Sequence, residues 1–234
     1  MAGDDTAGSR PVRVVVTRPA EQAGELVQRI ERIGHEVVVC PLIAVEAVGP
    51  TWVDASGYDW LVVTSVNGVR ELGRRLRGRA TRIAAVGSGT ASALAAQGLH
   101  ADLVPGVSTQ EGLLAALPRP AGRVLLAAAE DARRLLVDEL GADFVSLYRT
   151  RELRPAHFPA AELVLLASPS AARAYAALDL SIPAISIGPQ TTAAAHAAGT
   201  RVIAEAKTHD LDGLVAAAEV VAADVRGPER SRAK

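Results

Sequence analysis

One segment of the chain occurs twice, and this internal repeat limits the possible folds more than any other feature. The stretch 85–91 (AVGSGTA) matches the stretch 186–192 (SIGPQTT), 101 residues further on. The same offset pairs Gly98 with Gly199 and Gly112 with Gly213. Upstream, 63–67 (VTSVN) resembles 166–170 (LASPS) at a nearly equal offset. Two copies of one strand–loop–helix plan predict two similar domains.

Short β-branched runs alternate with alanine- and leucine-rich helical stretches, which predicts an α/β fold with parallel sheets flanked by helices. In the first helical stretch, one face at i, i+3, i+4 spacing is formed by Ala23, Leu26, Val27, Ile30 and Ile33, and Gly34 ends the helix. The expected strands are nearly continuous apolar runs, as strands covered on both faces require. They are expected at 12–17, 36–40, 60–64, 83–86, 124–127, 144–148, 163–167 and 184–187.

The predicted domain boundaries lie where this rhythm breaks, around 41–47 and around 149–155. If both breaks are linkers, the first domain is discontinuous, 11–42 plus 152–226, and the second, 43–151, is inserted into it. A two-stranded linker then joins the two domains. Residues 1–10 and 227–234 are polar or charged, and we expect disordered tails there because such segments bury too little apolar surface to become ordered.

Composition excludes several classes of function. The formal net charge of −1 provides no field to attract nucleic acid or an anionic membrane. The single cysteine, Cys40, excludes an internal disulfide, and no apolar run reaches the ~20 residues of a membrane span. The N-terminus has no hydrophobic core of a signal peptide, so we expect a cytoplasmic protein.

Motifs of better-known enzymes are missing as well. The glycine run after the strand at 83–86 lacks the third glycine of a dinucleotide-binding loop, and no Walker A lysine is present. Five histidines are scattered without ligand spacing, and we expect most of them at surfaces or helix faces and no metal site. Ser65 and Ser168 lack the glycines of a nucleophile elbow.

The remaining candidates are small, hydroxyl-bearing turns that follow the strands and open helices. They lie at 17–19, 64–68, 86–90, 168–171 and 188–192. Ligands of open parallel sheets bind beyond the carboxyl ends of the strands. Helix starts there present backbone N–H groups with no intrahelical partner, which bind phosphates or carboxylates. Any one such turn is more simply a helix cap. Five of them, recurring in both halves and facing one cleft, favour anion binding.

Tyr148 stands at the end of a predicted strand. Its phenol, with an ordinary pKa near ~10, is protonated at neutral pH and can donate a proton to a leaving oxygen. A tyrosine whose ring packs at a domain edge is the simpler interpretation from spacing alone.

Taken in order, these motifs resemble the bacterial uroporphyrinogen-III synthases over roughly residues 12 to 220. The matching stretches are VVVTRPAEQAGELVQRIERIGHEVVVCPLIAVE, YDWLVVTSVNGVREL, RIAAVGSGTASALAAQGLHADLVP, FVSLYRTREL, LVLLASPSAARAY and ISIGPQTTAAAHAAG. Each is a generic strand-to-helix turn, and their order and spacing carry the specificity. The chain departs from many relatives after Ser65, where they have proline or alanine, and after Thr208, where a proline often follows.

The resemblance implies two domains with a discontinuous first domain, and a monomer that needs no cofactor. The substrate it implies is hydroxymethylbilane, a linear tetrapyrrole with eight carboxylates, which is closed to uroporphyrinogen III with inversion of ring D and loss of water. It assigns Tyr148 as the acid that assists loss of hydroxide. It assigns carboxylate binding to Arg18, Thr64, Ser65, Asn67, Gly87, Ser88, Thr90, Ser168, Ser170, Gly188, Gln190, Thr191 and Thr192.

A different class of function also fits these patterns. Two hinged α/β domains describe a non-catalytic cytoplasmic sensor that binds an anionic small molecule in the inter-domain cleft. An interaction module with a degenerate site is a third hypothesis. Only an enzyme would turn the bilane into isomer III, since spontaneous closure gives the isomer without inversion.

Overall fold

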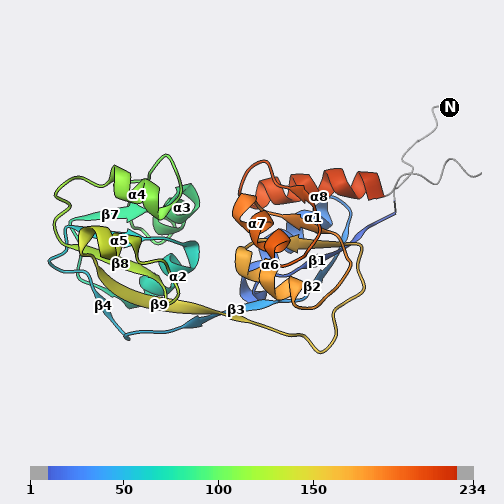
Figure 1. Cartoon of the computed structure of the whole chain (residues 1–234), viewed down its shortest axis with the longest axis horizontal. Coiled ribbons are helices and arrows are strands. Elements are labelled where there is room, and N and C mark those ends of the chain that lie inside the picture. The colour runs from blue at the N-terminus through green and yellow to red at the C-terminus, as the bar shows by residue number, and fades with distance from the viewer. Residues whose placement is uncertain (1–9, 226–234) are drawn as a thin grey trace, which may run out of the picture. The chain divides into compact units, whose positions relative to one another are not determined.

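The computed structural model describes residues 10–225 and shows a mixed α/β protein with parallel sheets and helices (Figure 1). The chain divides into two compact units, unit 1 within Met1–Ala44 and Arg151–Lys234, and unit 2 within Val45–Thr150. The tails predicted at 1–10 and 227–234 lie outside the described residues, except Arg10, which forms an ion pair with Glu162.

Unit 1 is a five-stranded sheet in the order β12-β11-β10-β1-β2, and all of its pairings are parallel. Counted along the chain this order is 2-1-3-4-5, which belongs to the doubly wound α/β folds. The strands are β1 (Arg13–Val16), β2 (Glu36–Val39), β10 (Leu163–Leu166), β11 (Ala184–Ser186) and β12 (Val202–Glu205). The helices are α1 (Ala20–Arg32), α6 (Pro169–Ala176), α7 (Pro189–Ala197) and α8 (Leu211–Val225).

Alternating side chains of these strands pack against helices on opposite faces of the sheet. Val14 and Val16 belong to a buried cluster with residues of α1 and α8, which lie side by side in Figure 1. Val15 belongs to a second cluster with residues of α6 and α7. Because neighbouring residues of a strand point to opposite faces, a strand buried on both must be apolar at every position. This confirms the interpretation of the continuous apolar runs.

Unit 2 has a five-stranded sheet in the order β3-β9-β8-β5-β7. Its strands are β3 (Ile43–Ala47), β5 (Trp60–Val63), β7 (Arg82–Ala85), β8 (Val124–Ala129) and β9 (Asp143–Glu152), with a short pair β4 (Val53–Asp54) and β6 (Leu76–Arg77). Its helices are α2 (Val66–Arg75), α3 (Ser88–Ala95), α4 (Gln110–Ala116) and α5 (Leu135–Leu140). Leu61 and Val63 pack with residues of α2 and α3, whereas Trp60 and Val62 pack with residues of α4 and α5.

The repeated sequence occupies matching places in the two sheets. Strands β7-β5-β8-β9 of unit 2 stand in the same order as β11-β10-β1-β2 of unit 1. The repeat pairs β5 with β10 and β7 with β11, so the first two strands of unit 1 correspond to the last two of unit 2. The units therefore share one plan in circularly permuted order. The helix starts also agree: Ser65 and Ser168 cap α2 and α6 with nearly equal backbone angles, φ −164° and −163°.

The structure corrects several local predictions. Strand β9 does not end at residue 148 but continues to Glu152, because it pairs with β3 as an antiparallel ribbon. Hydrogen bonds from Val48 N to Leu147 O (3.0 Å) and from Leu153 N to Leu42 O (2.8 Å) fix that pairing. Strand β12 was not predicted from the sequence. Four of the five histidines are exposed, as expected for most of them, and His35 is buried. Within residues 10–225, no helix is both long and apolar enough to cross a membrane.

We expect Tyr175→Phe to lower the free energy of unfolding by about 1 kcal/mol at neutral pH, because Ile182 O would lose a buried donor. The Tyr175 hydroxyl donates to Ile182 O at 2.7 Å, and its side chain is fully buried. Burial raises the pKa of this phenol to about 12. The native state therefore favours the protonated form, and this stability should be lost as the pH rises from 10 to about 12. Urea unfolding across that range should show a weaker pH dependence in the variant.

Tyr58, half-buried near the surface, provides a matched control because its hydroxyl donates to the Asp143 carboxylate at 2.8 Å, where water can replace it. An equal loss in Tyr58→Phe and Tyr175→Phe would contradict a contribution specific to the buried hydroxyl.

Candidate active site

The predicted site residues of unit 2 lie at one edge of its sheet. Parallel strands place their carboxyl ends together, and β5 pairs in parallel with both β7 and β8, so that Val63 lies beside Ala85 and Ala127. Helix α2 starts directly after β5, and helix α3 directly after β7. Strand β9 brings Tyr148 level with Ala129, the last residue of β8. The fold thus brings the phenol and both helix starts to the carboxyl edge, where ligands of such sheets bind.

Tyr148 is held by a direct contact with the start of α2. Its phenol oxygen lies 2.8 Å from Ser65 Oγ, and only 7% of the residue is exposed. The same Oγ accepts the backbone N–H of Gly68 at 2.9 Å, which makes Ser65 the N-cap of the helix. Because that bond uses a lone pair of the serine oxygen, the Ser65 hydroxyl proton remains available to the phenol oxygen. The phenol proton is then available to another acceptor.

The surroundings keep this phenol protonated at neutral pH. Burial raises the pKa of Tyr148 above the ordinary value of 10.0, the Ser65 hydrogen bond lowers this pKa in part, and the negative charge of Asp131 raises it. The phenol therefore gives up its proton only to an acceptor that is more basic than water, such as an oxygen on which negative charge develops as it leaves.

A β-bulge in β9 determines where the Tyr148 side chain points. Ser146 pairs with Ala128, but Tyr148 pairs with Ala129, so Leu147 is an extra residue at this point. Neighbouring residues of a regular strand point to opposite faces. Here, however, Leu147 and Tyr148 both belong to the cluster packed against α2 and α3. The bulge thus turns the tyrosine towards α2, in the way bulges re-aim side chains next to active sites.

The second helix start of unit 2 offers backbone groups rather than side chains. Gly87 is the N-cap of α3 and forms no side-chain cap. Ser88, the first residue of the helix, is exposed, whereas Thr90 is buried with 5% exposure. Thr64 and Asn67, near the start of α2, are half-buried.

In unit 1 the predicted residues gather at the carboxyl edge of its own sheet. Arg18 follows β1, Ser168 and Ser170 follow β10, and Gly188 begins α7 after β11. Ser168 Oγ accepts the Ala171 N–H at 3.2 Å, repeating the cap seen at Ser65. Gln190 is exposed in the first turn of α7, and Thr191 is buried.

Several predicted hydroxyl ligands are already engaged within the protein. Ser65 and Ser168 act as helix caps, and Thr192 Oγ1 bonds to Ser186 Oγ at 2.6 Å and to the Glu205 carboxylate. These hydroxyls order the helix starts, while the backbone N–H groups around them remain the groups suited to anions. The individual roles in substrate binding stay predictions. Among the described residues, no three or more His, Cys, Asp or Glu side chains are grouped to hold a metal ion.

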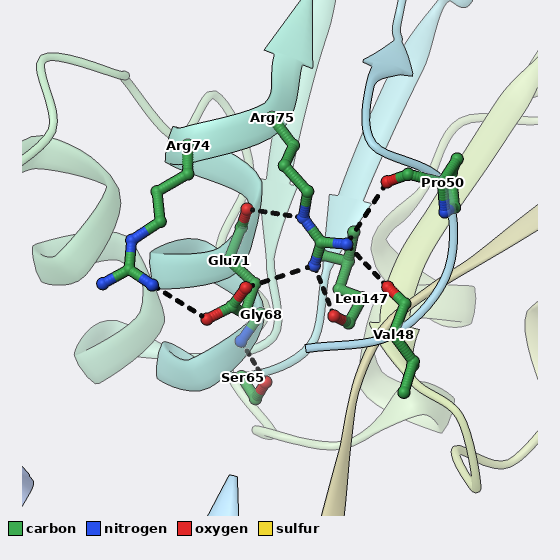
Figure 2. Close-up of polar contacts among 8 residues, drawn as sticks. All are labelled: Val48, Pro50, Ser65, Gly68, Glu71, Arg74, Arg75 and Leu147. Atoms are coloured by element: carbon green, nitrogen blue, oxygen red, sulfur yellow. Dashed lines mark hydrogen bonds and ion pairs between the residues drawn. The ribbon is translucent and has the colours of Figure 1, made fainter. Parts of the chain in front are cut away.

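Sequence reasoning missed two residues that interact with Tyr148 or with the strand that carries it. Asp131 follows β8 and acts on the Tyr148 phenol through its charge. Arg75, at the far end of α2, bonds the carbonyl of Leu147 next to the tyrosine (Figure 2). In the sequence, Arg74 and Arg75 look like the solvent-exposed end of an ordinary helix. No local signal indicates that one of the two is buried.

Comparison with known proteins agrees with this arrangement. A family model described as uroporphyrinogen-III synthase HemD matches residues 24–216. The uroporphyrinogen-III synthase of Synechococcus elongatus is 28% identical over 253 residues, covering 88% of this chain and 94% of that protein. The porphyrin biosynthesis protein HemD of Ruminiclostridium josui is 28% identical over 158 residues, which is 61% of this chain and 30% of that longer protein.

A solved structure shows the same fold. The crystal structure of a mutant uroporphyrinogen III synthase from the extreme thermophile Thermus thermophilus superposes with a TM-score of 0.59 at 19% identity, covering 92% of this chain and 99% of that one. The family model spans most of the sequence, and this chain therefore belongs to the uroporphyrinogen-III synthase family, the cyclising hydro-lyases of tetrapyrrole biosynthesis.

Proposed function

We propose that Tyr148 is the acid of the cyclisation and that helix starts of both units hold the carboxylates of hydroxymethylbilane. The observation that supports this most directly is the buried phenol at the carboxyl edge of unit 2, with Ser65 Oγ 2.8 Å from its oxygen. A general acid must be protonated at the working pH and must keep a proton free for the substrate. Tyr148 meets both requirements when the Ser65 hydroxyl donates to its oxygen.

The proposed step breaks the bond between the terminal carbon and its hydroxyl. The phenol gives its proton to that oxygen, water leaves, and the electron pair of the pyrrole stabilises the resulting azafulvenium cation. The phenolate left on Tyr148 keeps the hydrogen bond from Ser65 and balances the new positive charge. Ring D then attacks through its substituted carbon to give a spiro intermediate. The older bond between that carbon and its methylene breaks, and the methylene rejoins ring D at its unsubstituted carbon, so that the ring is inverted. The proton lost from this carbon returns to the phenolate of Tyr148.

Positioning, more than activation, supplies the proposed selectivity. The bilane cyclises without help, but to the isomer in which ring D is not inverted, so the enzyme must favour one folded shape of a flexible chain. Carboxylates of the substrate would be held by the helix starts at Arg18, Ser168–Ser170 and Gly188–Thr192 in unit 1. In unit 2 they would be held at Thr64–Asn67 and Gly87–Thr90. Several weak backbone contacts, spread over both units, suit a polyanion and a chain with net charge −1.

We also propose that the two compact units are similar domains joined by a two-stranded linker, with the first discontinuous. The unit boundaries after Ala44 and Thr150 lie close to those predicted from the sequence, 42 and 151. We further propose that the enzyme works as a cytoplasmic monomer without a cofactor, because proton transfer and ring closure need no group beyond those described.

Freshly prepared hydroxymethylbilane tests the function. We expect the protein to convert it into uroporphyrinogen III, detected by oxidising the products and separating the porphyrin isomers. A protein that only slows formation of the uninverted isomer would be a binder rather than this enzyme.

Tyr148→Phe should lower kcat and leave KM nearly unchanged, since its ring still packs in the same cluster. An unchanged kcat in this variant would remove Tyr148 from the mechanism.

Ser65→Ala should raise the pKa of the Tyr148 phenol further, because it removes the donor that lowers it. Ser65→Thr keeps a hydroxyl and a helix cap and should restore most of the wild-type value. The measurement is a fluorine NMR titration of protein labelled with fluorotyrosine, with the Tyr148 signal assigned from Tyr148→Phe. Equal pKa values in Ser65→Ala and wild type would show that the serine does not donate to the phenol.

Ser88→Glu should raise KM severalfold without lowering kcat, because a carboxylate at the exposed first turn of α3 would repel those of the substrate. The same charge interacts favourably with the helix dipole, so we expect no loss of stability. Ser92→Glu places an equal charge one turn further along the same helix, where Ser92 is also exposed, and serves as the control. Equal values of KM in both variants would argue against substrate binding at this helix start.

A further inference from the structure

Arg75 is an arginine of unit 2 that is withdrawn from water although it lies on a helix rich in exposed arginines. It is the last residue of α2, and its side chain is 12% exposed, whereas that of the neighbouring Arg74 is 77% exposed. Its ion-pair partner Glu71, one turn earlier, is equally sheltered at 13%. A charged pair with so little water around it needs further hydrogen bonds to offset the cost of desolvation.

The guanidinium has these hydrogen bonds, and each of its five N–H groups has an acceptor (Figure 2). Nε donates to Glu71 O at 3.1 Å, and Nη2 donates to Glu71 Oε2 at 3.3 Å and to Leu147 O. Nη1 donates to Val48 O at 2.6 Å and to Pro50 O at 3.3 Å. Three of the acceptors are therefore backbone carbonyls from segments far from α2 in the sequence. A lysine ammonium has three N–H groups on one nitrogen and cannot span this plane.

The carbonyls belong to the two chain segments that meet at the bulge. Leu147 is the extra residue of β9, and its carbonyl also accepts the Val48 N–H at 3.0 Å. Val48 and Pro50 flank Gly49, which has φ +77° and lies so close to β9 that a Cβ would stand 2.1 Å from Ser146 O. A side chain at position 49 would push this turn away from the strand, whereas glycine lets both flanking carbonyls meet the guanidinium.

Helix α2 therefore contacts the tyrosine strand at both of its ends. At its start, Ser65 bonds the phenol oxygen of Tyr148, and at its end, Arg75 bonds the carbonyl of Leu147, the residue before the tyrosine. The first contact fixes the tip of the side chain and the second fixes the backbone from which it projects. Since the bulge decides the face to which Tyr148 points, the group that holds the bulged residue controls the direction of the phenol.

We propose that Arg75 is a positioning residue for the acid: its guanidinium holds the bulged Leu147 and so aims the Tyr148 phenol at Ser65 and the carboxyl edge of the sheet. This inference rests on the proposed role of Tyr148. Arg75 makes no contact with the substrate in this proposal. Loss of its guanidinium should therefore affect the proton-transfer step rather than substrate binding.

The test replaces Arg75 by lysine, which keeps the positive charge and the pair with Glu71 but not the three carbonyl contacts. We expect Arg75→Lys to lower kcat by about tenfold to a hundredfold, as small misplacements of a catalytic group do, with KM close to the wild-type value. In fluorotyrosine-labelled protein, the Tyr148 resonance should shift, while those of Tyr58 and Tyr175 stay in place. The matched control is Arg74→Lys, since Arg74 is exposed and bonds only Glu71, and it should change neither kcat nor the Tyr148 resonance.

The two readouts separate this inference from the proposed function. If Tyr148→Phe leaves kcat unchanged, the acid role fails, and a shifted Tyr148 resonance in Arg75→Lys would still support positioning of the phenol. If Tyr148→Phe slows turnover while Arg75→Lys leaves both kcat and the Tyr148 resonance at wild-type values, the positioning role is overturned. A lower melting temperature in Arg75→Lys with an unmoved resonance would overturn it as well, in favour of a purely structural arginine.

A milder variant covers the case in which Arg75→Lys does not fold. Glu71→Gln keeps an acceptor for Nη2 but removes the charge that orients the guanidinium, and should shift the Tyr148 resonance in the same direction by a smaller amount. An unchanged resonance in this folded variant would then overturn the proposal.

Discussion

Parallel strand pairing is the constraint on which the candidate site depends. It brings the carboxyl ends of β5, β7 and β8 to one edge, and each of the helices that follow β5 and β7 must begin there. Helix starts expose backbone N–H groups, so a sheet of this kind gathers anion-binding groups without any basic side chain. The catalytic proposal adds one requirement, a proton donor at the same edge, and the bulge of β9 meets it by placing Tyr148 beside Ser65.

The arginines of this chain support the proposal that backbone groups, rather than basic side chains, bind the polyanionic substrate. Many are paired with carboxylates, as Arg13 is with Glu36, Arg133 with Glu111 and Arg149 with Glu46. Arg75 is turned inward to carbonyls. Positive charge is thus directed to the protein's own acidic and carbonyl groups, which fits the near-zero net charge. In the proposed binding mode, several weak contacts at helix starts would orient a flexible substrate, and no single strong contact would hold it in one place.

The two units share a strand order but differ at the strand that carries the proposed acid. In unit 1 the strand that corresponds to β9 is β2, whose pairing with β1 is regular from Arg13 to Val16, whereas β9 carries the bulge and the tyrosine. Tyr175, in unit 1, is buried with its hydroxyl bonded to Ile182 O and serves the core. A repeated framework therefore supplies similar helix starts twice, whereas the bulge that turns the proposed acid, Tyr148, towards a helix start belongs to β9 of unit 2.

Much of this was already determined by the sequence. Hydrophobic periodicity and the repeat predicted the α/β class, most of the strands and the turns that open the helices, because these depend on interactions between residues close along the chain. Tyr148 could be noted as a possible proton donor from its position, but it was assigned as the acid only through the resemblance to a family, since a lone tyrosine carries no local signal.

Only the tertiary structure decided where that tyrosine lies and which groups it contacts. The serine that bonds it lies 83 residues away in the sequence, and the buried arginine that holds its strand lies 72 residues from Leu147. The bulge that directs the tyrosine side chain exists only because β9 has one residue more than β8 at this point of their pairing. The burial of Arg75 depends on carbonyls contributed by two distant segments. None of these can be read from a local pattern, because they are properties of contacts that exist only once the sheet has formed.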